Sequence, residues 1–138
     1  MARGLEVMRA RASRVHLLIE CRDARIPISS ANPLLEDGSI KGPQRLILYN
    51  KADLADPDCN RQLLRNSRGD AMLLDATNRR QVQQVFERIK RIAKEQALGD
   101  KNLMLMICGI PNVGKSTILN KLRSLGQHTN RKAAVTGD

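Results

Sequence analysis

The segment that most constrains this chain is a glycine-rich loop, Gly109-Ile110-Pro111-Asn112-Val113-Gly114-Lys115-Ser116-Thr117. It satisfies the pattern GxxxxGK[ST], which is typical of loops that wrap a phosphate group. An apolar run precedes it and a predicted helix follows it, which is the arrangement that such a loop requires. The alternative is a plain glycine-rich turn, which would not need a lysine and a hydroxyl side chain at these two positions.

Phosphate binding by this loop would rest on backbone N–H groups that converge where glycine leaves room for them. The N-terminus of the following helix also favours negative charge. We expect Lys115 to neutralise the β- and γ-phosphates, as the catalytic candidate, and the Ser116 hydroxyl to bind Mg²⁺. The expected nucleotide-binding residues of this segment are Asn112, Val113, Gly114, Lys115, Ser116 and Thr117.

The order of apolar segments predicts an α/β domain with a parallel sheet. Continuous apolar runs of strand length are typical of buried parallel strands, and they occur at 15–19, 46–49, 71–74 and 103–108. Apolar spacing of three and four residues predicts amphipathic helices. The expected helices cover 2–13, 58–66, 80–97 and 115 to about 125, whereas 126–138 is expected to be polar and irregular.

A second motif, Asn50-Lys51-Ala52-Asp53, directly follows one predicted strand and selects the base. A carboxylate at Asp53 can accept hydrogen bonds from both the N1–H and the 2-amino group of guanine. Adenine would leave that carboxylate unpaired, which is costly. Asn50 would connect this loop to the phosphate loop, and the stem of Lys51 would cover one face of the base. The motifs together therefore predict binding of GTP or GDP with Mg²⁺.

The order of these motifs indicates a circular permutation. Asn50 to Asp53 comes first, Ala76-Thr77-Asn78 ends the next predicted strand, and the phosphate loop follows. Ala76, Thr77 and Asn78 match the loop whose backbone N–H meets the guanine O6, although alanine replaces the usual serine. Termini of compact domains lie at the surface, so such a rearrangement need not disturb the site.

Charge and composition limit the classes of partner that the chain is expected to bind. The net charge is +10, with 24 Lys and Arg residues against 14 Asp and Glu residues, which favours a polyanionic partner. With one Tyr, one Phe and no Trp, the chain offers no aromatic surface on which single-stranded RNA could stack. Any RNA contact is therefore expected to be with backbone phosphates. Three widely spaced cysteines predict reduced thiols, and no apolar stretch has the length of a transmembrane segment.

Taken together, these motifs resemble those of the circularly permuted GTPases of the YlqF/YawG group, the RbgA-like ribosome-assembly GTPases. The resemblance also rests on Asp23-Ala24-Arg25-Ile26-Pro27, on Ser30, Asn32 and Pro33, and on Thr136-Gly137-Asp138. The stretch Ile19-Glu20-Cys21-Arg22-Asp23 is most similar to the mitochondrial branch.

This resemblance implies a P-loop three-layer G domain and a role in assembly of the large ribosomal subunit. The implied partners are ribosomal RNA, ribosomal proteins and other assembly factors. The implied location is the mitochondrial matrix, peripheral to the inner membrane, with a bacterial-type cytoplasm as the alternative. Asn112 matches an asparagine that holds K⁺ in related GTPases; the alternative is that it only shapes the loop.

The resemblance also implies segments that this chain lacks. The related proteins continue after Thr136-Gly137-Asp138 into a γ-phosphate-reading threonine, a switch II motif and a helical domain. We therefore expect residues 1–138 to be part of a permuted G domain. Residues 126–138 would be the first switch region, which becomes ordered mainly through contacts with the γ-phosphate and Mg²⁺. The 103–108 strand would be left as a bare edge of the sheet. The enzyme hypothesis is a GTPase; the alternative is a nucleotide-bound scaffold that does not turn over.

Overall fold

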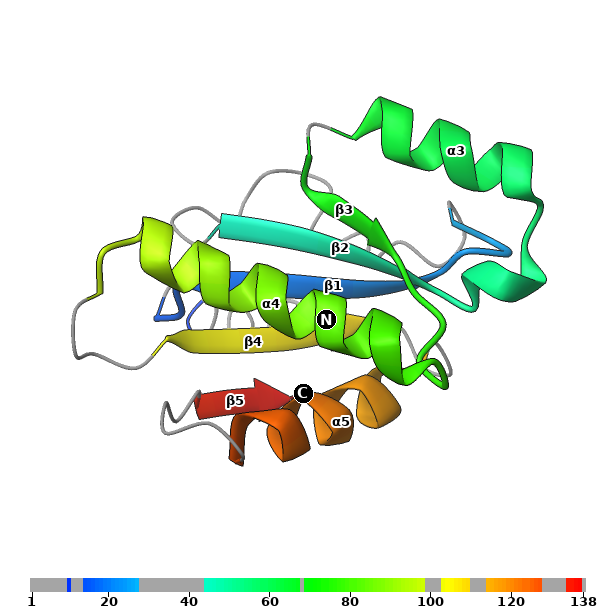
Figure 1. The fold of residues 1–138 in the computed structure, drawn as a ribbon. Coiled ribbons are helices and arrows are strands. Elements are labelled where there is room, and N and C mark those ends of the chain that lie inside the picture. The colour runs from blue at the N-terminus through cyan, green and yellow to red at the C-terminus, as the bar shows by residue number, and fades with distance from the viewer. Residues whose placement is uncertain are drawn as a thin grey trace.

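The computed structural model describes residues 10, 14–27, 44–67, 69–98, 103–109, 114–127 and 134–137. Five parallel strands form one sheet in the order β3-β2-β1-β4-β5 (Figure 1). The strands are β1 (Leu17–Asp23), β2 (Gln44–Asn50), β3 (Ala71–Leu73), β4 (Met104–Gly109) and β5 (Ala134–Gly137).

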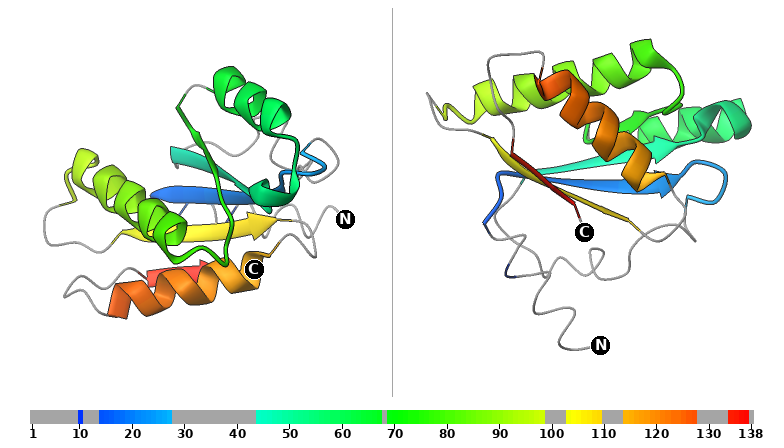
Figure 2. Two further views of the ribbon diagram at one scale, coloured as in Figure 1. Left: turned by 45° about the vertical axis from the view of Figure 1, so that its right-hand side comes forward. Right: turned by 90° about the horizontal axis from the view of Figure 1, so that it is seen from below.

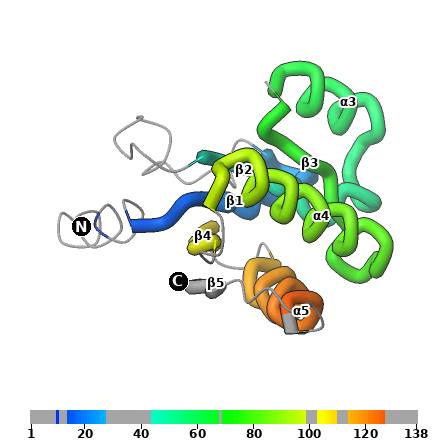
Figure 3. The backbone as a smooth tube through the Cα atoms, turned by 60° about the vertical axis from the view of Figure 1, so that its left-hand side comes forward, coloured from blue at the N-terminus to red at the C-terminus, as the bar shows by residue number. Residues whose placement is uncertain are grey.

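The described helices are α3 (Pro57–Asn66), α4 (Arg79–Glu95) and α5 (Lys115–Gln127), and a single 3₁₀ turn, η1, covers Ala52–Leu54. Helices α4 and α5 lie side by side on one face of the sheet (Figures 2 and 3). The predicted parallel α/β fold is confirmed, with one helical layer against the sheet in the described part of the chain. Most of the helix predicted at 2–13 lies outside the described residues.

The main core lies between the sheet and these two helices. Alternate residues of β1 (Leu17, Ile19 and Cys21) point toward the helices and are fully buried. The apolar positions of α4 predicted from their spacing are buried against them: Val82, Val85, Phe86, Ile89 and Ile92. Ile118 and Leu122 of α5 complete this core. The amphipathic pattern therefore correctly predicted which face of α4 packs on the sheet.

The other face of β1 carries a buried carboxylate that sequence patterns did not reveal. Glu20 has no exposed surface, and it accepts hydrogen bonds from Arg22 Nε at 2.7 Å and from Arg45 at 3.2 Å. The Arg22 guanidinium also lies 5.9 Å from the centre of the Tyr49 ring. A buried charge is tolerated when it is paired in this way. The apolar run at 15–19 therefore marks only part of this strand, because the paired Glu20 lets β1 continue to Asp23.

The end of the chain differs most from expectation. The prediction of an irregular 126–138 segment and of a bare edge at 103–108 was wrong. Helix α5 continues to Gln127, and β5 pairs with β4 along Met104–Ala134 to Ile107–Gly137. Parallel pairing satisfies the backbone groups that an edge strand leaves open. The β-branched pair Val135 and Thr136 was the available signal for a short strand.

Candidate functional site

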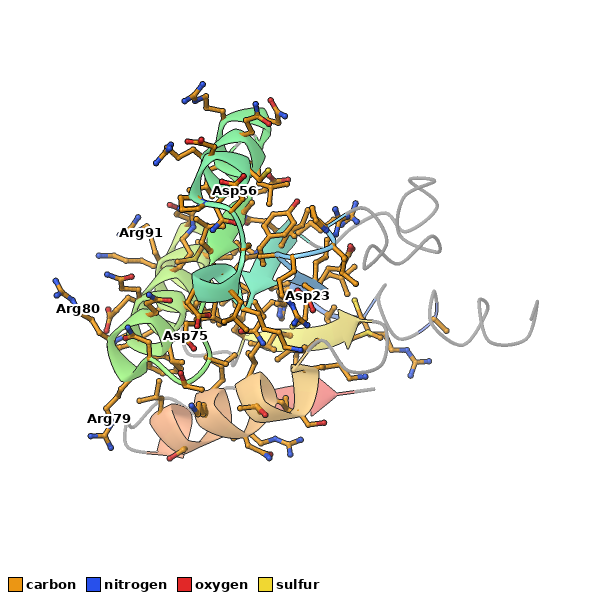
Figure 4. All side chains as sticks on the ribbon, turned by 90° about the vertical axis from the view of Figure 1, so that its right-hand side faces the viewer. Asp23, Asp56, Asp75, Arg79, Arg80 and Arg91 are labelled. Atoms are coloured by element: carbon orange, nitrogen blue, oxygen red, sulfur yellow. The ribbon has the colours of Figure 1, made fainter. Side chains whose placement is uncertain are left out.

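The predicted site residues gather at the edge of the sheet where the parallel strands end. Register places Asp23 of β1 beside Asn50 of β2, and Cys21 of β1 beside Gly109 of β4. Figure 4 looks onto this edge, and the labelled Asp23 and Asp75 lie on it. In open α/β sheets, ligands bind outside the carboxyl ends of the strands. The edge therefore brings the phosphate-loop end of β4 next to the predicted base-binding loop.

Asn50 is the side chain that joins these parts. It is 4% exposed, and its Oδ1 accepts a hydrogen bond of 3.1 Å from the backbone N–H of Ala76. Its amide nitrogen lies against the backbone of Gly114, since a Cβ built on that glycine would come within 2.2 Å of Nδ2. The side chain of Asn50 thus lies between the Ala76 loop and the phosphate loop, as its predicted connecting role requires.

Gly114 is required here for two physical reasons. Its φ is +87°, a conformation that side chains other than glycine rarely adopt, and Asn50 occupies the space a Cβ would need. Because Asn50 approaches Gly114 so closely, the residue that precedes α5 presents only backbone atoms. Lys115 is the first residue of that helix, and Ser116 and Thr117 are exposed in its first turn. A glycine, a lysine and a hydroxyl side chain at the start of a helix fit a phosphate group and its Mg²⁺.

The loop from Lys51 to Leu54 is pinned at its backbone. The N–H of Ala52 donates to the carbonyl of Leu74 at 3.1 Å, and its own carbonyl accepts from the buried Asn60 side chain at 2.9 Å. Lys51 has φ of 60°, in the left-handed region. Asp53 is exposed in this fixed loop. The carboxylate predicted to read guanine is therefore open to a ligand while its backbone is held.

Asp23 is a site residue whose contacts sequence reasoning did not predict. Its carboxylate accepts from the backbone N–H and the Nε of Arg25 at 2.9 and 3.0 Å, and it lies 3.7 Å from Lys51 Nζ. The hydrogen bonds from the Arg25 side chain are the main cause that lowers the pKa of Asp23. The buried carboxylate therefore stays ionised and holds Arg25 close to Lys51 of the predicted base-binding loop.

The turn from Asp75 to Asn78 is held largely by one carboxylate. Asp75 Oδ1 accepts from the N–H and the hydroxyl of Thr77 at 2.9 and 2.6 Å, and these bonds lower the pKa of Asp75. Asn78 caps α4, because its Oδ1 accepts from the N–H of Gln81 at 3.2 Å. Asn78 therefore has a structural role at this loop, and Thr77 is the exposed residue between it and the buried Ala76.

Lys121 of α5 is a second residue that sequence reasoning missed. Its ammonium donates a hydrogen bond to the carbonyl of Ala76. No local motif marks it, because it is one of several polar residues on a helix. The contact depends on how α5 packs beside the turn that leads into α4.

The chain carries buried thiols beside this edge. Burial is the main cause that raises the pKa of Cys21 to about 12, and the nearby Lys115 opposes this rise. Cys108 is also buried, whereas Cys59 on α3 is exposed, and all three are free thiols, as predicted.

Two predicted residues, Asn112 and Val113, lie outside the described residues, so their positions stay predictions. Within the described ranges, no group of three or more His, Cys, Asp or Glu side chains could hold a metal ion. Nor does that part of the chain contain a helix with the length and apolarity needed to cross a membrane.

A parallel α/β sheet, with Gly114 and Lys115 at the start of the helix that follows β4 and an Asn-Lys-x-Asp loop at the carboxyl edge, is consistent with the fold of a P-loop GTPase domain. Comparison with known proteins agrees. Residues 104–138 match a family described as 50S ribosome-binding GTPase. The chain is 34% identical to Short integuments 2, mitochondrial, of Arabidopsis thaliana, over 91% of this chain and 33% of that protein.

Two further relatives match over the whole chain. Mitochondrial ribosome-associated GTPase 1 of Ictalurus punctatus is 34% identical over 100% of this chain and 46% of its own length. Ribosome biogenesis GTPase A of Priestia megaterium is 34% identical over 100% of this chain and 49% of its own length. The chain is thus a homologue of these ribosome-associated GTPases, which confirms the predicted resemblance. It spans between a third and a half of the length of these relatives.

Proposed function

We propose that the protein binds and hydrolyses GTP and acts in assembly of the large ribosomal subunit. The observation that carries this proposal is the position of Asn50 between Ala76 and Gly114, which unites the base-reading and phosphate-binding loops. The homology to ribosome biogenesis and mitochondrial ribosome-associated GTPases supports the same function.

In this site, Asp53 would accept hydrogen bonds from guanine, and Thr77 with its neighbours Ala76 and Asn78 would face the 6-oxo group. The stem of Lys51 would cover the base. Gly114, Lys115 and Thr117, with Asn112 and Val113, would surround the phosphates, and Ser116 would hold Mg²⁺. Bound Mg²⁺ would offset phosphate charge, and Lys115 would stabilise the charge that develops on the transferred phosphoryl group.

Competition between nucleotides tests the base-reading part of this proposal. GTP and GDP should displace a fluorescent guanine nucleotide from the purified protein, whereas ATP should fail to do so at concentrations about a hundredfold higher. Equal displacement by ATP would contradict the assignment of Asp53 and favour an unrelated P-loop ATPase.

Hydrolysis is separated from simple binding by a single-turnover measurement on the full-length protein, with and without large ribosomal particles. We expect conversion of bound GTP to GDP, and we expect the particles to accelerate it. Stable GTP on the particle would instead favour the second hypothesis, a nucleotide-bound scaffold. A Lys115→Ala variant, which loses the phosphate-neutralising charge, provides the inactive reference.

The outer surface of α4 is the face we propose for ribosomal RNA. Arg79, Arg80, Arg91 and Lys94 are exposed on this helix, and Figure 4 shows the three arginines projecting outward from it. Arg88 differs from them, because its guanidinium donates to the carbonyl of Gly69. A helix with four outward cations fits the phosphate backbone of RNA; the alternative is a solvated basic surface.

The names of several relatives support a mitochondrial location, which we propose to be the matrix, peripheral to the inner membrane. Other relatives are named ribosome biogenesis GTPase A and come from bacteria, so a bacterial-type cytoplasm is the alternative. Affinity purification under low salt tests both: the proposal expects mitochondrial large-subunit RNA and proteins, with other assembly factors, in the purified particle.

K⁺ is the second cation of the proposed site. If Asn112 holds K⁺, hydrolysis should be faster in potassium than in sodium, because a further positive charge would stabilise the phosphoryl transfer. An Asn112→Ala variant should lose this difference. Equal wild-type rates in both salts would leave Asn112 with a role in loop shape only.

A further inference from the structure

Lys121 contacts the Ala76 loop. This loop contains neither the carboxylate expected to read the base nor the backbone expected to bind the phosphates. Its ammonium donates to the carbonyl of Ala76, and its charge contributes to the lowered pKa of Asp75 next to it. Lys121 is half-buried, and it reaches this turn from α5, the helix that begins at the phosphate loop.

The carbonyl of Ala76 and the N–H of Thr77 belong to the same planar peptide group, in which they point in opposite directions. A hydrogen bond to the carbonyl therefore fixes the direction of the Thr77 N–H. The other side of Ala76 is fixed as well, because its own N–H donates to Asn50 at 3.1 Å. The Ala76 residue is thus held from α5 and from β2 at once.

The Thr77 N–H is the donor in this loop with access to a ligand. Ala76 is 6% exposed and its N–H is used by Asn50, while the N–H of Asn78 donates to the carbonyl of Asp75 at 2.9 Å. Thr77 is exposed, and its N–H donates to the Asp75 carboxylate at 2.9 Å. A guanine O6 would share or replace that carboxylate as acceptor.

We propose that Lys121 is a positioning residue for base selection, which aims the Thr77 N–H at the purine 6-oxo group. A cation on the carbonyl also polarises the peptide and makes its N–H a better donor. This inference rests on the proposed binding of guanine nucleotides and adds a residue from the phosphate side of the site. Because α5 begins at the phosphate loop and carries Lys121, this contact would couple nucleotide phosphates to the position of the Thr77 N–H.

The test uses nucleotides that differ only at the base, in the protein variants Lys121→Met and Lys121→Arg. 6-Thio-GTP keeps the N1–H and the 2-amino group but presents sulfur, a weak acceptor, at position 6. Inosine triphosphate keeps the 6-oxo group and the N1–H but lacks the 2-amino group. Lys121→Met keeps a similar stem without a donor, and Asn120→Ala is the matched control on an exposed position of the same helix.

We expect Lys121→Met to weaken GTP binding by about fivefold, the equivalent of one hydrogen bond. It should weaken 6-thio-GTP binding less, so that discrimination between the two falls at least about threefold. The ratio of GTP to inosine triphosphate affinity should not change, because the 2-amino contact with Asp53 is untouched. Lys121→Arg, which keeps a donor, should restore the discrimination, and Asn120→Ala should behave as wild type.

Unchanged discrimination between GTP and 6-thio-GTP in a folded Lys121→Met protein would overturn the proposal. If Lys121→Met fails to fold, a folded Lys121→Ala variant takes its place. Lower discrimination in Lys121→Ala, with wild-type discrimination kept in Lys121→Arg, supports the proposal, whereas unchanged discrimination in Lys121→Ala overturns it. A wild-type protein that does not bind GTP would contradict the proposed function instead.

Discussion

At the residue scale, the site divides into side chains that hold the loops and side chains that are open to a ligand. Asn50, Asp23 and Asn60 are buried, and each contacts a neighbouring loop, through hydrogen bonds for the two asparagines and an ion pair with Lys51 for Asp23. Asp53, Thr77 and Ser116 are exposed next to them. Buried groups of this kind fix the position of the exposed ones, so changes to the exposed residues should alter binding with little effect on folding.

Asp53→Asn tests this division. The amide can donate to the 2-oxo group of xanthine, so we expect GTP affinity to fall at least about tenfold and affinity for xanthosine triphosphate to rise. The thermal midpoint should stay close to wild type, because Asp53 is exposed. Asp58→Asn, an exposed carboxylate on α3, is the matched control and should change neither affinity. Retained preference for GTP in Asp53→Asn would contradict the assignment of the base-reading loop.

Asp23 predicts a pH dependence of stability. Its folded-state pKa is lowered, first by the Arg25 side chain, so the folded state binds fewer protons than the unfolded state just below the unfolded pKa of about 4. Its contribution is therefore complete above about pH 4 and is lost as the pH falls through the folded pKa. Asp23→Asn should be less stable than wild type near neutral pH, and the difference should shrink in acid.

Urea unfolding without nucleotide, at a series of pH values from neutral to acid, measures this difference. The subtraction between the two proteins is needed because Asp75 and Glu87 also have lowered pKa values. A gap between wild type and Asp23→Asn that stays constant across the series would mean that Asp23 contributes by packing only.

At the element scale, the ends of helices connect folding to the site. Asp56 caps α3, where it accepts from the N–H of Asp58 at 2.9 Å, and Asn78 caps α4. Only the α4 cap lies in the loop predicted to face the base. The two caps are therefore similar in physical type but different in position.

We expect Asn78→Ala and Asp56→Ala each to lower the free energy of unfolding by about 1 kcal/mol. Asn78→Ala should also weaken GTP binding, since α4 begins directly after Thr77, whereas Asp56→Ala should leave it unchanged. Denaturant titration and nucleotide affinity measure the two effects. Equal effects on nucleotide binding would show that the position of the α4 start does not matter to the base.

The elements were predictable to different degrees. The spacing of Val82 to Ile92 predicted α4 closely, because a helix packed along one face needs a regular apolar stripe. The sequence could not predict that β1 continues through Glu20, since the partner Arg45 is on another strand. Similarly, the motifs located Asn50, Asp53 and Lys115, but not Lys121, whose contact with Ala76 depends on the packing of α5.

At the scale of the whole molecule, only part of the positive charge is available to a partner. The net charge is +10, yet several cations have internal partners: Arg22 and Arg45 bond to Glu20, and Arg25 bonds to Asp23. Lys90 pairs with Glu87 at 3.2 Å on α4 itself. The outward cations of α4 are therefore a better measure of the proposed RNA-binding surface than the total charge.

Association with large ribosomal particles should weaken with salt. We expect the triple variant Arg80→Gln, Arg91→Gln and Lys94→Gln to flatten the slope of log affinity against log salt by up to about 0.7 for each phosphate contact that is lost. Arg65→Gln on α3 is the control for loss of an exposed cation. Arg88 is left unchanged because its contact with Gly69 contributes to the fold. An unaltered slope in the triple variant would assign this face to solvent.

The unequal burial of the three thiols has a practical consequence for spectroscopy. A maleimide reacts with accessible thiolates, so a dye added to the folded protein should attach to the exposed Cys59 and spare the buried Cys21 and Cys108. Cys59 belongs to the helix that follows the Lys51–Leu54 loop (Figure 1). The natural chain therefore carries a single attachment point for a fluorophore near the base-reading loop, and nucleotide exchange could be followed without engineering a cysteine.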